Sequence, residues 1–199
     1  EVLEAVDRWI GALREAVGKD VAIALDLNFN FNAGACITIG KTLEQYNLAW
    51  FEIDLYDPKA LRTVRDAIQT PITSCENILG LSNYRPYFDA GSMDVTSVDI
   101  IWNGFRESVE IAKEAGTRGM EVVPHNYNGH LSTMISAHWA AVLENVKIME
   151  YDVDDVPWRD SLFTDIPAVS NGVMTLNDKP GWGCDVREDV LKEHPWPKS

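Results

Sequence analysis

The sequence is poor in cysteine and in basic residues, and it contains no long hydrophobic run. The three cysteines, Cys36, Cys75 and Cys184, are scattered and form no CxxC pair. Free or buried thiols in a reducing compartment are therefore expected, and we predict a cytoplasmic protein. No apolar stretch approaches the ~18–20 residues that cross a bilayer, which argues against a membrane protein.

Basic residues are outnumbered by acidic ones. The chain has 17 Lys and Arg against 31 Asp and Glu, which gives a formal net charge of −14 over 199 residues. Nucleic acids and anionic membranes bind clustered Lys and Arg, so neither is expected as a partner. An acidic chain can still bind an anionic small molecule when a cation lies in the site.

Helical and strand patterns alternate along the first three quarters of the chain. Apolar runs predict strands at 21–26, 48–54, 71–77, 94–101, 120–126 and 146–152. Spacing of apolar residues and helix stop signals predict helices at 2–17, 41–47, 57–69, 81–91, 105–116 and 131–145. This alternation is typical of parallel βαβ units, either in a doubly wound sheet or in a β/α barrel.

The absence of a glycine-rich phosphate loop after any strand disfavours the doubly wound sheet. A complete barrel needs about eight strands and ~250 residues. We therefore predict an α/β fold, an incomplete (β/α) barrel of about six units over residues 1–152. From Val153 the sequence turns rich in Asp, Pro and Gly, and we expect an ordered arm over 153–199. A helical pattern is already under way at Glu1, so the chain is expected to begin inside a longer protein.

An ionisable residue ends each predicted strand, at intervals of 23–26 residues: Asp26, Glu52, Glu76, Asp99, His125 and Glu150. A single strand-end carboxylate is more often a helix cap or a solvated loop residue, so the regular set carries the prediction. The C-terminal ends of barrel strands meet at one mouth, where several carboxylates would repel one another without a cation. Three neighbouring carboxylates suit a hard ion such as Mg²⁺, and Asp26 is predicted to be a metal ligand.

His125 ends the predicted strand that comes directly after the one ending at Asp99. A carboxylate that accepts a hydrogen bond from an imidazole fixes its tautomer and raises its basicity. The pair therefore predicts a general base or acid. Four of the seven tryptophans are expected to pack in the interior rather than to contact a ligand: Trp102, Trp139, Trp158 and Trp182.

Several short motifs resemble the enolase superfamily, in its mandelate racemase/muconate-lactonizing branch. VAIALDLN, LAWFEID and TSCEN resemble the three segments that carry the metal carboxylates. SVDIIWNG followed by VVPHNYNGH resembles the Asp–His dyad of the mandelate racemase subgroup, and IMEYD resembles a later strand with a glutamate near the substrate. PGWGCDVREDVL resembles the family's ending, which packs back against an N-terminal cap domain.

The resemblance implies a role for each matching residue. His125 would be the general base or acid oriented by Asp99, Glu150 would contact the substrate carboxylate or enolate oxygen, and Asn28 would contact substrate. The Mg²⁺ ligands would be Asp26, Glu52 and Glu76. One motif departs from the family, because Glu52-Ile53-Asp54 stands where Glu-Glu-Pro is usual. The family's Lys-x-Lys strand and its cap domain have no counterpart here, so the second acid or base, the stereochemistry and the substrate are not given.

The family's shared step is abstraction of the proton α to a carboxylate. Members with the Asp–His dyad are mostly acid-sugar dehydratases, so the resemblance favours dehydration of an acid sugar to a 2-keto-3-deoxy acid. The polar loops NFNFN and HNYNGH also suit a polyhydroxylated small-molecule carboxylate. A racemase or epimerase of a 2-hydroxy acid, a metal-dependent sugar isomerase and a non-catalytic member remain as alternatives. Family members are often multimeric, but no stripe of residues indicates a homo-oligomer.

Overall fold

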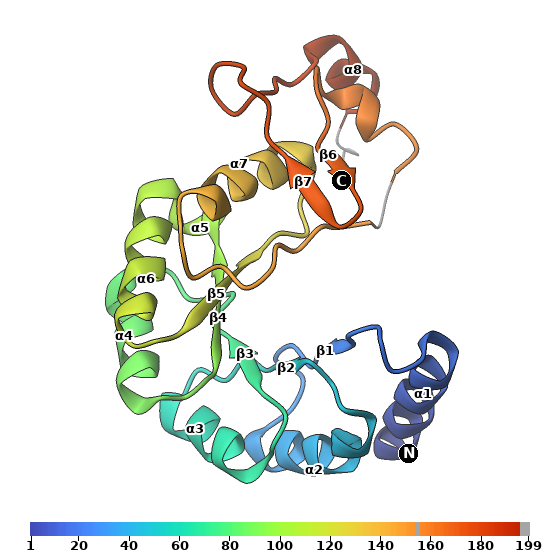
Figure 1. The fold of residues 1–199 in the computed structure, drawn as a ribbon, viewed down its shortest axis with the longest axis vertical. Coiled ribbons are helices and arrows are strands. Elements are labelled where there is room, and N and C mark those ends of the chain that lie inside the picture. The colour runs from blue at the N-terminus through green and yellow to red at the C-terminus, as the bar shows by residue number, and fades with distance from the viewer. Residues whose placement is uncertain (154–155, 196–199) are drawn as a thin grey trace.

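The structure is a computed structural model that describes residues 1–153 and 156–195. Its centre is a five-stranded parallel sheet in the order β1-β2-β3-β4-β5, which confirms the predicted α/β class. The strands are β1 (Ala24–Asp26), β2 (Trp50–Glu52), β3 (Ile72–Ser74), β4 (Val95–Asp99) and β5 (Glu121–His125). They lie along the inner side of an arc whose outer side is formed by helices (Figure 1).

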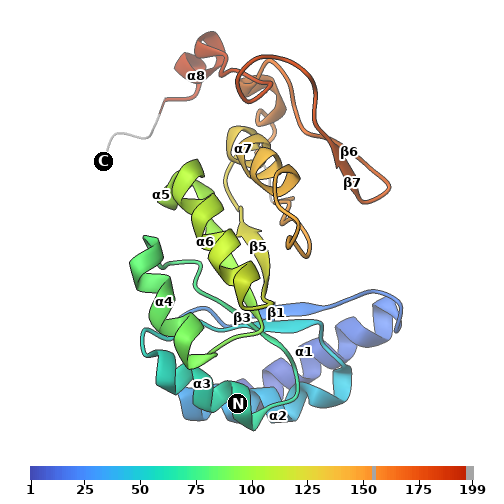
Figure 2. The same ribbon diagram turned by 60° about the vertical axis from the view of Figure 1, so that its left-hand side comes forward.

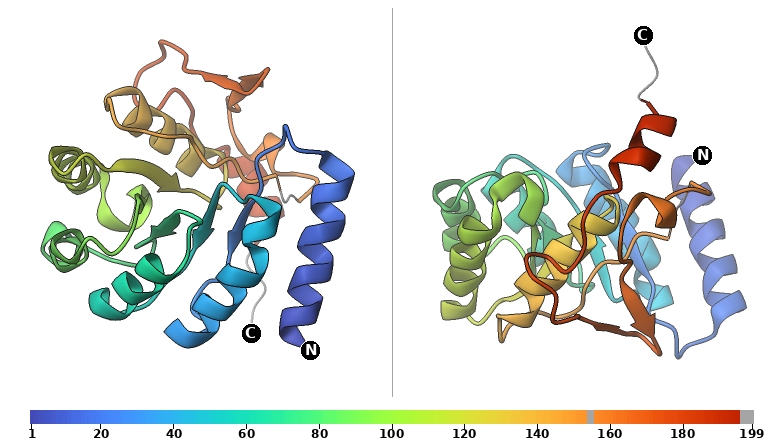
Figure 3. Two further views of the ribbon diagram at one scale, coloured as in Figure 1. Left: turned by 60° about the horizontal axis from the view of Figure 1, so that its bottom comes forward. Right: turned by 90° about the horizontal axis from the view of Figure 1, so that it is seen from above.

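The outer helices alternate with the strands along the chain and spread like a fan around them (Figure 3, left). They are α1 (Val2–Val17), α2 (Ala33–Leu43), α3 (Pro58–Ala67), α4 (Leu81–Ala90), α6 (Phe105–Thr117) and α7 (His130–Ala141). The core lies between the two layers, where Phe51 and Ile72 of the sheet and Leu61 and Ile111 of the helices are fully buried. Continuous apolar strands are expected when both faces of a parallel sheet are covered.

Capping residues decide where the helices begin. Asp57 accepts a hydrogen bond from the Lys59 N–H at 2.9 Å, and Pro58 occupies the first turn, as the sequence predicts for α3. The helix predicted at 41–47 instead begins at Ala33, because Asn32 caps it by accepting from Ala35 N–H at 3.0 Å. A 3₁₀ turn, η1 (Glu44–Tyr46), follows it.

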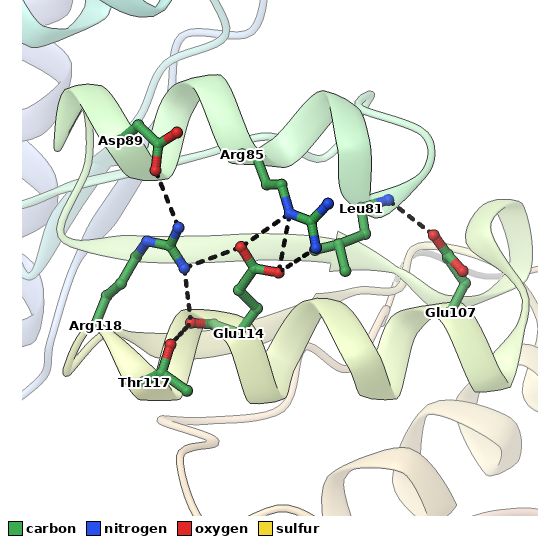
Figure 4. Close-up of polar contacts among 7 residues, drawn as sticks. All are labelled: Leu81, Arg85, Asp89, Glu107, Glu114, Thr117 and Arg118. Carbon is green, nitrogen blue, oxygen red and sulfur yellow. Dashed lines mark hydrogen bonds and ion pairs between the residues drawn. The ribbon is translucent and has the colours of Figure 1, made fainter.

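A charge network fastens α4 to α6 (Figure 4). Glu114 on α6 accepts hydrogen bonds from Arg85 on α4 at 3.0–3.1 Å and from Arg118 at 3.0 Å. Arg118 also donates to Asp89, again at 3.0 Å. Because Arg85 is half-exposed, we attribute to this network a modest contribution to stability and no role in the chemistry.

The prediction of a sixth strand at 146–152 is wrong. Within the described residues this segment contributes only an isolated parallel bridge between Val146 and Val122 of β5. The Val122 N–H donates to Asn145 O at 2.9 Å and the Lys147 N–H donates to Val122 O at 2.9 Å, but the next donor on β5 would be residue 124. That residue is Pro124, which has no N–H, so the ladder ends there.

The C-terminal segment contains structure that the sequence did not predict. It includes η2 (Asp160–Leu162), an antiparallel pair of β6 (Ala168–Ser170) and β7 (Val173–Thr175), and α8 (Glu188–Glu193). It lies beside α7 at the end of the arc opposite α1 (Figures 1 and 2). Trp182 packs on Phe105 of α6 and His138 of α7, with ring centroids 5.3 and 5.7 Å apart. The division at 152/153 and the contact with a cap domain remain predictions.

No helix in the described part of the chain is both long and apolar enough to span a membrane.

Candidate active site

Parallel pairing brings the strand-end residues together in twos. Asp26 of β1 pairs in register with Glu52 of β2, and Asp99 of β4 pairs in register with His125 of β5. Glu76 follows the end of β3 by two residues. The intervals of 23–26 residues seen in the sequence are therefore the repeat of the βα unit, as predicted.

These residues face one pocket of about 410 Å³ at the C-terminal edge of the sheet. Six of the seven predicted site residues line it, and the seventh, Asp99, is fully buried behind His125. The lining residues are Asp26, Asn28, Phe29, Glu52, Glu76, Asn77, Trp102, His125, Tyr127 and Glu150. Ligand sites of α/β proteins lie at this edge of the sheet.

Asp99 holds His125 in place. Its Oδ2 lies 2.9 Å from His125 Nδ1, and its Oδ1 accepts a hydrogen bond from the Trp102 N–H at 2.7 Å. The second bond caps the short helix α5 (Ile100–Asn103), so the carboxylate is fixed at both oxygens. An ionised carboxylate only accepts, so Nδ1 carries the proton and Nε2 faces the pocket.

The other imidazole nitrogen, His125 Nε2, lies 3.2 Å from Glu76 Oε2. Burial alone would lower the pKa of His125, but the hydrogen bond to Asp99 and the negative charges of Glu76 and Glu150 outweigh it. The pKa of His125 therefore lies above its usual value. An imidazole whose two nitrogens meet two carboxylates is suited to holding a proton and passing it on.

The pocket concentrates negative charge around Glu52. Burial, followed by repulsion from Glu76, Asp26 and other carboxylates, raises the pKa of Glu52 to about 8. Its Oε1 is buried and has no hydrogen-bond partner among the described residues. The pKa of Glu76 is also raised, mainly by burial, although the charge of His125 opposes the shift. A buried carboxylate oxygen without a partner is costly, which indicates a place for a cation or a donor.

The residues around Glu76 form a tight turn. Asn77 Nδ2 donates to Glu76 Oε1 at 2.8 Å, and the turn is closed by the Ile78 N–H, which donates to Cys75 O at 3.1 Å. Cys75, the residue before Glu76, has φ 86°, a conformation that a non-glycine residue adopts at a cost of about 1–3 kcal/mol. Such strain persists only where neighbouring contacts enforce it.

Asn28 and Glu150 are held by backbone contacts. The Asn28 N–H donates to Asp26 Oδ1 at 2.6 Å, which ties the loop after β1 to the carboxylate. The Asn126 N–H donates to Glu150 Oε2, and Asn126 Nδ2 donates to Glu150 O at 3.1 Å. Glu150 thus stays in the pocket although its strand is reduced to a bridge.

Aromatic residues in the pocket were missed by the sequence reasoning. Trp102 does not pack in the interior as predicted: it lines the pocket, with its ring centroid 5.5 Å from that of His125. Tyr127 lies 5.0 Å from the same ring, and Phe29 stacks on Tyr56 at 5.8 Å. Trp102 and Tyr127 stand two or three residues after strand-end site residues, a signal that could have found them.

The chemistry of the pocket residues fits a divalent cation. Asp26, Glu52 and Glu76 offer oxygen donors from three adjacent strands, and Glu52 Oε1 is buried and unpartnered. As the side chains stand, however, no three His, Cys, Asp or Glu residues of 1–153 and 156–195 are grouped closely enough to enclose an ion. Both oxygens of Glu76 are engaged, by Asn77 and His125. The ligand set therefore stays a prediction.

Comparison with known proteins identifies the family of this chain. The family model described as enolase C-terminal domain-like matches residues 3–190. The chain belongs to this family. The resemblance of the motifs to the enolase superfamily is thus confirmed, and the five-stranded parallel sheet is part of the family's barrel.

Two curated relatives of this enolase-superfamily chain are named as dehydratases of sugar acids. It is 29% identical to D-xylonate dehydratase of Haloferax volcanii, over 93% of this chain and 46% of that protein. It is 28% identical to arabinonate dehydratase of Saccharolobus solfataricus, over 96% of this chain and 52% of that protein. The chain therefore spans about half the length of the curated relatives it matches.

A solved structure from Burkholderia xenovorans is also similar. It is 45% identical, with a TM-score of 0.92, over 94% of this chain and 46% of that one. That protein carries the provisional description L-alanine-DL-glutamate epimerase, and its crystals hold magnesium and fumarate.

Proposed function

We propose that this chain carries the acid–base and metal-binding residues of an Mg²⁺-dependent enzyme that removes the proton α to a carboxylate. The proposed reaction is dehydration of an acid sugar to a 2-keto-3-deoxy acid. The observation that carries the proposal is the buried Asp99–His125 pair at 2.9 Å, which opens into a pocket with four further carboxylates. The sugar-acid dehydratases among the relatives support the choice of substrate class.

The proposed ligands of the cation are Asp26, Glu52 and Glu76. A bound Mg²⁺ supplies positive charge at the substrate carboxylate, where negative charge develops when the α-proton leaves. A cation held by these three carboxylates would also offset the repulsion that helps to raise the pKa of Glu52. If Glu76 binds the cation, it would no longer contact His125, and His125 Nε2 would be free to face the substrate.

His125 is the proposed acid or base, and Asp99 is its positioning residue. With Nδ1–H held by Asp99, Nε2 exchanges a proton with the substrate at the pocket side. In dehydration, neutral His125 Nε2 takes the α-proton from C2, the hydroxyl on C3 leaves as water after receiving that proton, and the enol product tautomerises to the 2-keto acid. His125 supplies the proton to the leaving hydroxyl in this scheme.

Glu150 and Asn28 are proposed to bind the substrate. Glu150 is anchored through Asn126 at the edge of the pocket, where its side chain faces the proposed position of the substrate carboxylate or enolate oxygen. Asn28 lines the pocket beside Asp26 and offers an amide to a hydroxyl group. Trp102 and Tyr127 flank His125, so they restrict the approach of the substrate to Nε2.

A second candidate is racemisation or epimerisation at the α-carbon. It is favoured by the 45% identical structure, whose provisional description is an epimerase. The same Asp99–His125 pair would remove the proton from one face, and a second group would return it to the other. The two candidates share the first step and differ in the fate of the β-hydroxyl.

The test is a screen of acid sugars with the full-length protein and Mg²⁺, with detection of 2-keto-3-deoxy acids. The dehydratase proposal predicts product from at least one acid sugar and none from the His125→Asn variant. Inversion at the α-carbon, with exchange of the α-proton for deuterium from D₂O and without keto acid, would instead establish the epimerase candidate. If the protein binds Mg²⁺ but gives no keto acid and no exchange of the α-proton, both candidates are refuted.

A further inference from the structure

Asp54 is a buried carboxylate next to the pocket that the proposed reaction does not use. It stands two residues beyond β2 and is only 7% exposed. One oxygen, Oδ1, accepts hydrogen bonds from the Cys75 N–H at 3.0 Å and from Ser74 Oγ at 3.1 Å. The side chain therefore bridges the C-terminal ends of two neighbouring strands, β2 and β3.

The residue that Asp54 holds is the strained one. Cys75 has φ 86° and its carbonyl accepts from the Ile78 N–H at 3.1 Å and from Tyr84 Oη at 3.0 Å. The peptide groups on both sides of Cys75 are thus held, the N–H by Asp54 and the C=O by the turn and Tyr84. Without an acceptor for its N–H, Cys75 has little reason to keep a conformation that L-residues avoid.

Cys75 in turn directs Glu76. Glu76 and Asn77 are the central residues of the turn that starts at Cys75, so rotation of the Cys75 backbone would move the Glu76 carboxylate out of its place in the pocket. Asp54 itself does not line that pocket; it lines a separate small cavity of about 10 Å³ between Phe29 and Tyr87. Its effect on the chemistry must therefore pass through the Cys75 turn.

We propose that Asp54 is a positioning residue whose carboxylate clamps the Cys75 turn and so sets the place of Glu76 among the pocket carboxylates. This inference rests on the proposed role of Glu76 as a ligand of Mg²⁺. It assigns to the Asp54 side chain a task that needs the acceptor oxygen rather than the negative charge. Groups that orient a metal ligand in this way alter metal affinity by about 10–100-fold when they are removed.

The experiment is calorimetric titration of the full chain with Mg²⁺ alone. Asp54→Leu keeps the branched shape of the side chain but removes the acceptor, and we expect it to weaken Mg²⁺ binding by about 10–100-fold. Asp54→Asn keeps an acceptor oxygen for Cys75 and is expected to retain most of the affinity. Cys75→Gly added to Asp54→Leu should restore affinity, because glycine adopts a positive φ without strain.

A matched control is Asp94→Ala. Asp94 Oδ2 accepts a hydrogen bond from the Ile72 N–H at 2.9 Å, at the opposite end of the same strand. Its loss should lower the melting temperature without changing Mg²⁺ affinity. If Asp54→Leu does not fold, Asp54→Ala takes its place in the comparison.

Three results would overturn the clamp. One is unchanged Mg²⁺ affinity in folded Asp54→Leu, and another is an equal loss in Asp54→Asn, which would show that the charge matters and not the acceptor. The third is failure of Cys75→Gly to restore affinity. Glu76→Gln is titrated in parallel: if it leaves affinity unchanged, the ligand assignment of the proposed function fails as well. A loss in Glu76→Gln without one in Asp54→Leu overturns the clamp alone.

Discussion

Replacing Asp99 should cost more stability than replacing any ordinary helix cap. The side chain is fully buried and each oxygen has a partner, the Trp102 N–H at 2.7 Å and His125 Nδ1 at 2.9 Å. Loss of a cap costs about 0.5–2 kcal/mol. Loss of a hydrogen bond to a charged partner costs about 1.5–3 kcal/mol. Asp99→Ala is therefore expected to lower the free energy of unfolding by about 2–5 kcal/mol.

Urea unfolding of the metal-free protein measures this loss, with Asp57→Ala as the matched control. Asp57 also caps a helix, through the Lys59 N–H at 2.9 Å, but has no histidine partner, so its variant should lose only about 0.5–2 kcal/mol. Asp99→Asn keeps the cap and should fall between the two. The reasoning is refuted if Asp99→Ala costs no more than Asp57→Ala.

The difference in unfolding free energy between wild type and Asp99→Asn should depend on pH with a definite sign. The pKa of His125 is raised in the folded protein, so the charged pair stabilises fully below the ordinary pKa of about 6.5 and less as pH rises through the folded value. The gap between wild type and Asp99→Asn should therefore be largest near about pH 6 and shrink on the alkaline side. A gap that widens with pH would contradict the assignment.

Three further predictions follow from other contacts. Glu52→Gln should stabilise the metal-free protein by a few kcal/mol above about pH 8, where the buried carboxylate is charged, yet weaken Mg²⁺ binding; unfolding in EDTA and calorimetry measure the two effects. Glu114→Gln should lose about 0.5–1 kcal/mol near neutral pH. Its hydrogen bond from Arg85 lowers the pKa of Glu114, so this stabilisation disappears as pH falls below about 4.5, and catalytic activity should not change. Gly172→Ala should cost about 1 kcal/mol in thermal unfolding, because φ there is 74°.

Periodicity in the sequence was enough to predict the α/β class and the pocket. Apolar runs and their spacing located β1 to β5, and parallel pairing then required strand-end residues such as Asp99 and His125 to be neighbours. Strand register alone brings Asp26 beside Glu52 and Asp99 beside His125, because residues at matched ends of parallel strands lie at the same edge of the sheet.

Features that depend on a single residue were harder to predict. Pro124 removes one donor and ends the ladder that would have made 146–152 a strand. Asn171-Gly172 is a typical hairpin turn, but the surrounding Asp- and Pro-rich sequence was interpreted as irregular. The β6–β7 hairpin was therefore missed.

The pocket shows the same limit. The left-handed conformation of Cys75 and its hold by Asp54 are invisible in the sequence, because nothing in TSCEN indicates a positive φ at a cysteine. Trp102 was assigned to packing by residue type, whereas its position after a strand-end carboxylate brings it against His125. Residue type sets what a side chain can do, and the turn after the strand decides where it does it.

The most direct test of the central claim is an anomalous diffraction experiment on crystals of the protein soaked with Mn²⁺ in place of Mg²⁺. The account predicts one strong anomalous peak in the pocket, within coordination distance of Asp26, Glu52 and Glu76, with His125 no longer in contact with Glu76. No peak there, or a peak held by other residues while His125 keeps its contact with Glu76, would contradict it.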